Sequence, residues 1–309
     1  MFRQLFAILV ISCTLTLPVA AQQAAPLKVV TTFSILGDLV RQVGGENVAI
    51  TTLVGSDQDM HSYSIKPSDM TALKEADVIF ANGLGLDTWI NKAAASVNKK
   101  PQVFVVSSYI VPLAAEEDGN HQYKEGDAVP AADPHAWQDV NNTRQYINRI
   151  TEILSDADKE HAALYQQRAT DYLAALTQLE NDIITGLGAI PRERRIIATS
   201  HDAFGYFAHA YDITILPISS INTDVEPSAA SIAKLIRQIR EQNIKTIFIE
   251  NISNPRTAES IAAEAGAGIG GKLYSDALSG PDGPASTYVD MMRYNLKTIL
   301  AGLKSPARR

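Results

Sequence analysis

The sequence predicts an α/β protein with two similar lobes, each a mainly parallel β-sheet flanked by helices, joined by one long rigid α-helix. Three observations support this fold class. The 309 residues are enough for two domains of ordinary size. Short β-rich runs alternate with helical patterns in residues 27–140 and again in residues 192–309. Between them, residues 141–188 form a helical region in which neither glycine nor proline occurs before residue 186.

The first lobe is predicted from four apolar runs. We expect strands at residues 28–32, 48–54, 76–81 and 103–106, and helices at 35–43, 67–74 and 87–96. The run at 76–81, ADVIFA, is apolar without alternation, which indicates a strand buried on both faces of its sheet. Strands of this kind are typical of parallel sheets covered by helices.

The linking region has apolar residues at helical spacing, among them Leu164, Tyr172, Leu176, Leu179 and Ile183. We expect helices at 140–154 and 156–187, with a restart at 155–156. A helix of about 30 residues is about 45 Å long. A solvated coiled coil is the alternative, but the two flanking α/β halves favour a strut that joins two lobes.

The second lobe repeats the pattern of the first. We expect strands at 196–199, 214–218, 246–250 and 272–274, and helices at 203–210, 228–242, 255–265 and 285–303. Two similar α/β lobes imply a cleft between them, and ligands of such folds bind at the carboxyl ends of the strands.

Residues 1–21 have the three parts of a secretory signal peptide. Arg3 supplies a positive start, residues 5–17 are apolar, and small residues end at Ala21. The apolar run is too short for a permanent membrane anchor, so we expect secretion to the periplasm. Lipoprotein processing at Cys13 is the alternative. Cleavage after Ala21 would remove this single cysteine, which excludes disulfides and thiolate chemistry from the mature protein.

The charge of the chain excludes one class of partner. The formal net charge is −7, so the sequence lacks the basic footprint of a nucleic-acid-binding protein. With 46% hydrophobic residues it can bury sizeable cores, as a globular protein does.

The stretch DPHAW at 133–137 is the first candidate for a functional site. Asp133 is suited to cap a helix and Pro134 to its first turn, which would place His135 at the helix N-terminus. The positive end of the helix dipole would keep the imidazole neutral and available to a metal ion. A capped helix with a surface histidine is the alternative interpretation.

Three other polar residues are expected at the same cleft. His61 follows the strand at 48–54, His201 directly follows the strand at 196–199, and Asp276 follows the strand at 272–274. Together with His135 they make three imidazoles and one carboxylate, a usual tetrahedral set for zinc that also accepts other divalent ions. The four residues lie far apart in sequence, so spacing alone does not define the site.

Three acidic residues lie where they could orient the imidazoles: Asp133, Asp202 and Glu250. Helix capping explains the first two equally well, whereas Glu250 ends a buried strand. The remaining histidines, His121, His161 and His209, are expected to be solvated or structural.

Four motifs resemble one family in the same order along the chain. They are HSYSIKPSD at 61–69, DPHAW at 133–137, HDAFGYF at 201–207, and YSDAL at 274–278 with Thr287-Tyr288. The sequence is identified as a member of the metal-binding solute receptors of bacterial ABC transporters, the cluster A-I that takes zinc, manganese or iron. The resemblance implies that His61, His135, His201 and Asp276 are the ligands and that the strut helix limits hinge motion. It also implies a monomeric periplasmic receptor, not an enzyme, that delivers metal to a membrane permease.

The sequence differs from other members of this family in two ways that bear on the choice of metal. Many zinc-uptake members have a histidine-rich loop before the DPH motif, whereas the loop 114–132 is acidic and contains only His121. Manganese members commonly have glutamate at the position of His201. Three nitrogen donors favour zinc, so we expect zinc, with manganese or ferrous iron as the alternative. The acidic loop leaves open whether a periplasmic metallochaperone supplies the metal.

Two other functions are alternatives to a metal receptor. A secreted zinc hydrolase would keep an open position on the ion, with Asp276 as its base, but the chain has no HExxH motif. A metal-dependent adhesin is a third possibility. Within the receptor hypothesis, Asp276 is a candidate gate for metal release, and one carboxylate would leave a zinc site with net charge +1 unless another acid is near.

Overall fold

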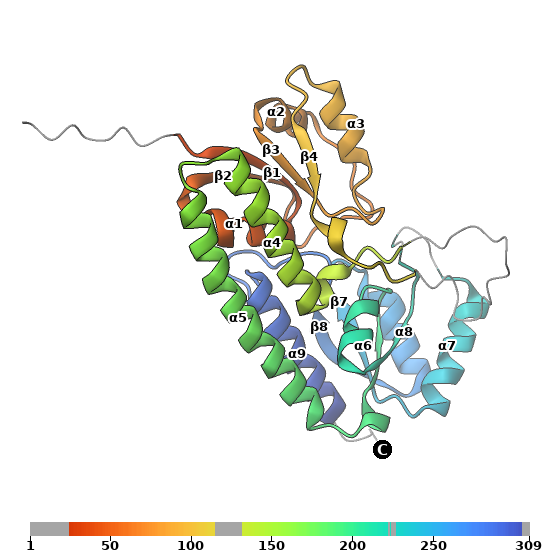
Figure 1. Cartoon of the computed structure of the whole chain (residues 1–309). Helices are drawn as coiled ribbons and strands as arrows, with labels where there is room; N and C mark the ends of the chain where they lie inside the picture. Colours follow the sequence, from red (N-terminus) through yellow and green to blue (C-terminus); the bar gives the residue numbers. More distant parts are fainter. Residues whose placement is uncertain (1–24, 115–131, 222, 224–226, 305–309) are drawn as a thin grey trace, which may run out of the picture.

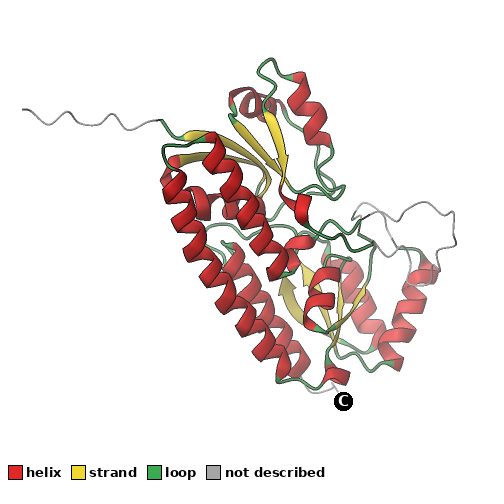
Figure 2. Cartoon of the chain, in the orientation of Figure 1, coloured by secondary structure: helices red, strands yellow, loops and turns green. Residues whose placement is uncertain are grey.

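Two four-stranded parallel sheets form the two lobes of the protein. The computed structural model describes residues 25–114, 132–221, 223 and 227–304. The first sheet has the order β2-β1-β3-β4, with strands β1 Leu27–Phe33, β2 Val48–Val54, β3 Val78–Ala81 and β4 Gln102–Val105. The second has the order β6-β5-β7-β8, with β5 Ile196–Thr199, β6 Thr214–Pro217, β7 Thr246–Glu250 and β8 Gly268–Leu273. The predicted fold class is confirmed, and Figure 2 shows the two sheets with helices around them.

Helices cover both faces of the first sheet. In β1, Val30 faces a core shared with α2 Pro67–Glu75 and α3 Trp89–Ser96. The neighbouring Val29 points to the opposite face, where α1 Ser34–Gly44 packs. Burial of both faces explains why the strands of this sheet are rich in apolar residues on both faces, most completely in β3.

The second lobe is covered in the same way. The helices α7 Ala229–Glu241 and α8 Pro255–Ala265 share a core with β5 and β7. On the other side, α9 Tyr288–Lys304 packs against β8 and β5, and α6 Gly205–Tyr211 follows β5.

The linking region is a hairpin of two helices rather than one. α4 Val140–Ala157 and α5 Ala162–Gly188 lie antiparallel, with an ion pair of 3.0 Å between Arg144 and Glu180 (Figure 1). The predicted restart at 155–156 comes a few residues too early. The turn forms at Asp158, whose carboxylate accepts hydrogen bonds from the backbone N–H of His161 and from the hydroxyl of Tyr165 in the first turn of α5.

Helix α5 connects the two lobes along the length of the molecule. Its 27 residues extend for about 40 Å. It contacts α1 in the first lobe and α9 in the second, and a single hydrophobic core runs from Val29 through α4 and α5 to Leu303. A large apolar interface of this kind opposes independent movement of the lobes.

Two elements of the second lobe begin at other residues than the sequence predicts. The strand predicted at 272–274 begins earlier, at Gly268, and the last helix begins at Tyr288 rather than at 285. No helix in the described part of the chain is long and apolar enough to span a bilayer. The predicted signal peptide with Cys13, and His121 with most of the loop 114–132, lie outside the described residues.

Candidate metal centre

Four side chains from both lobes converge on one point. The Nε2 atom of His61 lies 3.2 Å from Nε2 of His135 and 3.2 Å from Oδ2 of Asp276. Nε2 of His201 is 3.2 Å from Oδ2 of Asp276, and Nε2 of His135 is 3.4 Å from Oδ1. One ligand atom of each residue lies within 4.8 Å of all the others. The structure thus brings together the four residues that the sequence singled out.

The fold explains why these residues meet. His61 lies in the loop after β2, His201 directly follows β5, and Asp276 lies just after β8. His135 precedes the short 3-10 helix η4, Ala136–Gln138, ahead of α4. Because the carboxyl ends of the two parallel sheets face each other, side chains that follow the strands share one space.

The donors are buried without enough partners of their own. His135, His201 and Asp276 are at most 1% exposed. Both carboxylate oxygens of Asp276 and Nε2 of His201 make no well-aligned hydrogen bond among the described residues, and face one another only at ion-pair distances. Unpaired buried polar atoms are costly, and a cation at the centre would satisfy all of them at once. The donor set fits a divalent transition metal.

Asp133 positions His135 in a way that corrects the sequence-based prediction. It does not cap a helix: Asp133 Oδ1 accepts hydrogen bonds from the backbone N–H and from Nδ1 of His135, at 2.9 and 2.8 Å. The 3-10 helix starts only at Ala136, and α4 is capped by Asp139, which accepts from the N–H of Asn141. The short segment ahead of α4 leaves no helix at Asp133 to cap.

The prediction that the imidazole of His135 stays neutral is also wrong, because its pKa is raised and not lowered. Burial alone would lower the pKa of His135, but Asp276 and Asp133 outweigh it and raise the pKa to about 9. The pKa of His201 is likewise raised against burial, by Glu250 and Asp276. Burial would raise the pKa of Asp276, yet His135 and His201 hold it well below its usual range.

Glu250 pairs with His201 as Asp133 pairs with His135. Its Oε2 lies 2.5 Å from Nδ1 of His201, and its Oε1 accepts from the backbone N–H of His201 at 2.8 Å. The Glu250 side chain is fully buried. Asp202, the other acidic candidate, follows His201 in sequence and is partly exposed. Two further acids near the centre mean that the net charge of +1 expected from Asp276 alone does not hold.

The segments that carry His135 and Asp276 are bonded to each other. The indole Nε1 of Trp137 and the amide Nε2 of Gln138 both donate to the carbonyl of Ser275 at 2.9 Å. The hydroxyl of Tyr288 donates to the carbonyl of Trp137 at 2.8 Å. Sequence reasoning missed Gln138 and Ser275, since nothing in their residue types marks them. Trp137, the last residue of the DPHAW motif, is a buried donor between the lobes.

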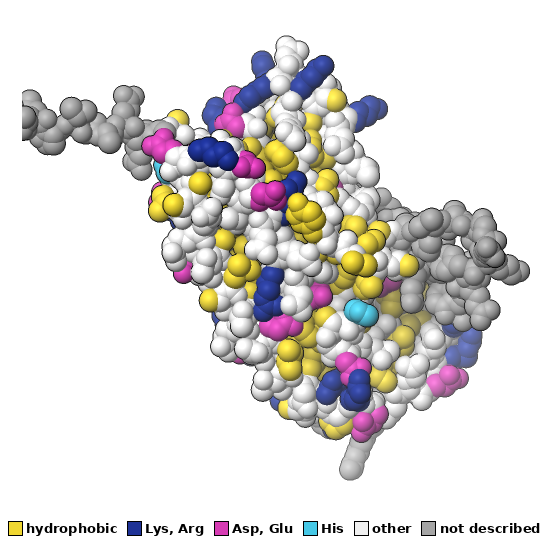
Figure 3. All heavy atoms as spheres, viewed as in Figure 1, with side chains coloured by type: hydrophobic (Ala, Val, Ile, Leu, Met, Phe, Trp, Pro, Cys, Tyr) yellow, Lys and Arg dark blue, Asp and Glu magenta, His cyan; other side chains and the backbone are white. Residues whose placement is uncertain are grey.

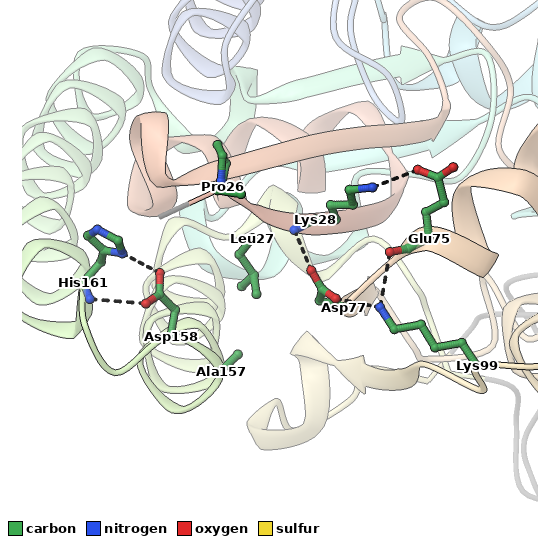
Figure 4. A pocket seen from close by; sticks show the side chains of 10 residues that line it. Pro26, Leu27, Lys28, Glu75, Asp77, Lys99, Ala157, Asp158 and His161 are labelled. Carbon is green, nitrogen blue, oxygen red and sulfur yellow. Dashed lines mark hydrogen bonds and ion pairs between the residues drawn. The ribbon is translucent and has the colours of Figure 1, made fainter. Parts of the chain in front are cut away.

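Charged residues elsewhere form no comparable site among those described. A pocket of about 450 Å³ lies at the amino end of β1, but its lysines are paired: Lys28 with Glu75 at 3.0 Å and Lys99 with Asp77 at 2.6 Å (Figure 4). His161, which the sequence marked as structural, pairs there with Asp158. On the face in Figure 3, basic and acidic side chains are interspersed without a large patch of one sign.

Comparison with known proteins places this centre in a family. The family described as "Zinc-uptake complex component A periplasmic" matches residues 29–302. The chain is 33% identical to the manganese-binding lipoprotein MntA of Halalkalibacterium halodurans, over 90% of the chain and 88% of that protein. It is 32% identical to the iron-binding protein YfeA of Yersinia pestis, over 90% and 87%.

A solved structure agrees in fold over most of the chain. The periplasmic zinc-binding protein TroA of Treponema pallidum superimposes with a TM-score of 0.81 at 28% identity, covering 91% of this chain and all of that one. The family comprises solute-binding proteins rather than enzymes, which sets the zinc hydrolase aside. This chain therefore belongs to the zinc-uptake complex component A family, the metal-binding substrate-binding proteins of ABC transporters.

Proposed function

We propose that the protein captures one divalent transition metal ion between its lobes and delivers it to a membrane permease for import. His61, His135 and His201 would donate nitrogen and Asp276 a charged oxygen. The observation that carries this proposal is the convergence of four donors from both lobes, three of them buried, with no well-aligned hydrogen bond to either oxygen of Asp276 among the described residues. In the same proposal Asp133 and Glu250 orient two of the imidazoles, as carboxylates do behind metal-bound histidines.

We propose zinc as the metal. Three imidazole nitrogens and one carboxylate are a usual tetrahedral zinc set, whereas manganese prefers oxygen ligands. The relatives named for manganese and iron make these two ions the alternatives.

The metal is tested by elemental analysis of the protein purified from its native compartment, followed by competition between zinc and manganese. Zinc should be the main metal recovered and should displace manganese at equal concentration. Tighter binding of manganese than of zinc would overturn the choice of zinc while leaving the receptor function intact.

The location and partners follow from the same function. We propose a monomer that acts in the periplasm, and a periplasmic metallochaperone remains a candidate source of the metal. Relatives such as MntA are named lipoproteins, so lipid attachment at Cys13 is the alternative to cleavage after Ala21. Mass spectrometry of the mature N-terminus distinguishes the two, because only one form retains Cys13 and carries lipid.

A further inference from the structure

A small pocket adjoins the metal centre on one side. It measures about 140 Å³ and contains His201 in its lining. The second lobe contributes the end of β5, the segment after β6 and the start of α8, while the first lobe contributes Asp59. Its lining includes the hydroxyl residues Ser219, Thr223, Ser253 and Thr257. Oxygen groups of this kind can replace the water around a hydrated divalent cation.

Asp59 connects this pocket to a metal ligand and to the opposite lobe. Its Oδ1 accepts from the backbone N–H of His61 at 2.9 Å. Its Oδ2 accepts from the hydroxyl of Thr223 at 2.7 Å, across the lobes, and from the hydroxyl of Ser62 at 3.1 Å within its own loop. One carboxylate thus bonds to the second lobe at the lining of the pocket and holds the backbone of His61.

His61 is the least constrained of the four donors. His135 and His201 each have a buried carboxylate against Nδ1. Within the described residues no acidic side chain lies against the Nδ1 of His61, and its side chain is 6% exposed while those of the other donors are at most 1%. Its position depends on the loop that Asp59 ties down.

Asp276, the gate suggested by sequence, is held in place by the two residues that precede it. The carbonyl of Ser275 accepts from Trp137 and Gln138. The backbone of Tyr274 is bonded in both directions to the side chain of Asn295, at 2.9 and 2.7 Å. Release through Asp276 would break these buried contacts. The loop of His61 is tied to the second lobe through the partly exposed Asp59 and the exposed Asp57. The backbone N–H of Asp57 donates to the carbonyl of Leu278 at 2.9 Å, and Asn251 donates to Oδ1 of Asp57 at 3.0 Å.

We propose that the pocket is the route by which the metal ion enters and leaves, and that the Asp59–Thr223 hydrogen bond is the latch that closes it over His61. This inference rests on the proposed function and names the moving part of the same site. When the latch opens, Asp59 and His61 move away from Thr223 while Asp57 stays bonded to the second lobe, and the ion meets the carboxylate of Asp59 on its way out.

The latch is tested by stopped-flow release of zinc to a chelator. Thr223→Val keeps the shape of the side chain and removes only the hydroxyl, so the dissociation rate should rise roughly tenfold, the factor expected for a hydrogen bond to a carboxylate. Thr223→Ser should restore the wild-type rate. Ser62→Ala is the matched control, since it removes a hydroxyl from the same oxygen of Asp59 without crossing the lobes, and it should leave the rate within about twofold.

Two outcomes would overturn the latch. One is an unchanged dissociation rate in a folded Thr223→Val protein, and the other is an equal acceleration by Ser62→Ala, which would show that Asp59 only shapes its own loop. Failure of the proposed function would give another result. The wild-type protein would then not bind one equivalent of zinc in an equilibrium titration.

The route is tested by filling the pocket. Ser253→Phe places a ring in the passage, so association and dissociation should both slow by the same factor, at least about fivefold, while the affinity stays constant because the barrier alone changes. The same change at the exposed Ser96 in α3 is the control and should alter neither rate. Wild-type rates in Ser253→Phe would contradict the route.

Discussion

The imidazoles of His135 and His201 are fixed by a pair of buried carboxylates that have the same relation to their histidines. Asp133 and Glu250 each accept from the backbone N–H of the histidine and lie against its Nδ1. This double contact sets the direction of the ring and leaves Nε2 free to face the proposed ion. It also makes the imidazole a better donor, since a carboxylate behind it stabilises the positive charge it shares with the ion.

Glu250→Gln should weaken zinc binding by about tenfold to 100-fold, the usual cost of losing such a partner. The amide keeps the size of the side chain but loses the charge against Nδ1 of His201. Titration against a chelator of known affinity measures the change. Glu46→Gln, at an exposed glutamate before β2, is the control, and an equal loss there would contradict a specific role of Glu250.

Zinc affinity should rise with pH between about 6 and 8. The pKa of His135 is raised to about 9, so at pH 7 its ring holds a proton that the ion must displace, and the competition fades as the pH approaches that value. His201 contributes in the same direction. Calorimetric titration at pH 7 in buffers of different protonation enthalpy should show net proton release. Binding without proton release would contradict this account.

At the scale of elements, the sequence predicts which segments form strands, but predicts their first and last residues less well. Apolar runs such as ADVIFA mark β3 because both faces of a covered parallel strand are buried. The start of β8 was missed because Gly268, Gly270 and Gly271 read as a loop. A Cβ on Gly270 would lie 2.0 Å from Cγ2 of Thr246, so the glycine is required by close packing that no local pattern reveals.

Close packing of α9 gives a prediction at the same scale. A Cβ on Gly302 would lie 2.5 Å from the ring of Phe248, so Gly302→Ala should destabilise the fold by about 1–3 kcal/mol despite the better helix propensity of alanine. Gly188→Ala, at the end of α5, meets nothing within 4 Å and should stabilise by up to about 1 kcal/mol. Denaturant unfolding measures both, and a stabilising Gly302→Ala would contradict the packing.

For the whole molecule, the two lobes and the order of their strands and helices could be predicted from the sequence, but the detailed contacts of the candidate metal centre could not. That His61, His135, His201 and Asp276 meet follows from strands whose carboxyl ends face each other. The role of Asp133 was mistaken, because the same residue types suit a helix cap and a histidine partner. The hairpin of α4 and α5 and the continuous core depend on contacts between distant segments, which local periodicity does not contain.

The central claim is that one metal ion sits between the lobes on these four side chains. The most direct measurement is anomalous diffraction at the zinc edge from crystals of the zinc-loaded protein. The account predicts one peak about 2.0–2.2 Å from Nε2 of each of the three histidines and from an oxygen of Asp276. A peak elsewhere on the protein, or zinc that is bound without contact to both lobes, would contradict it.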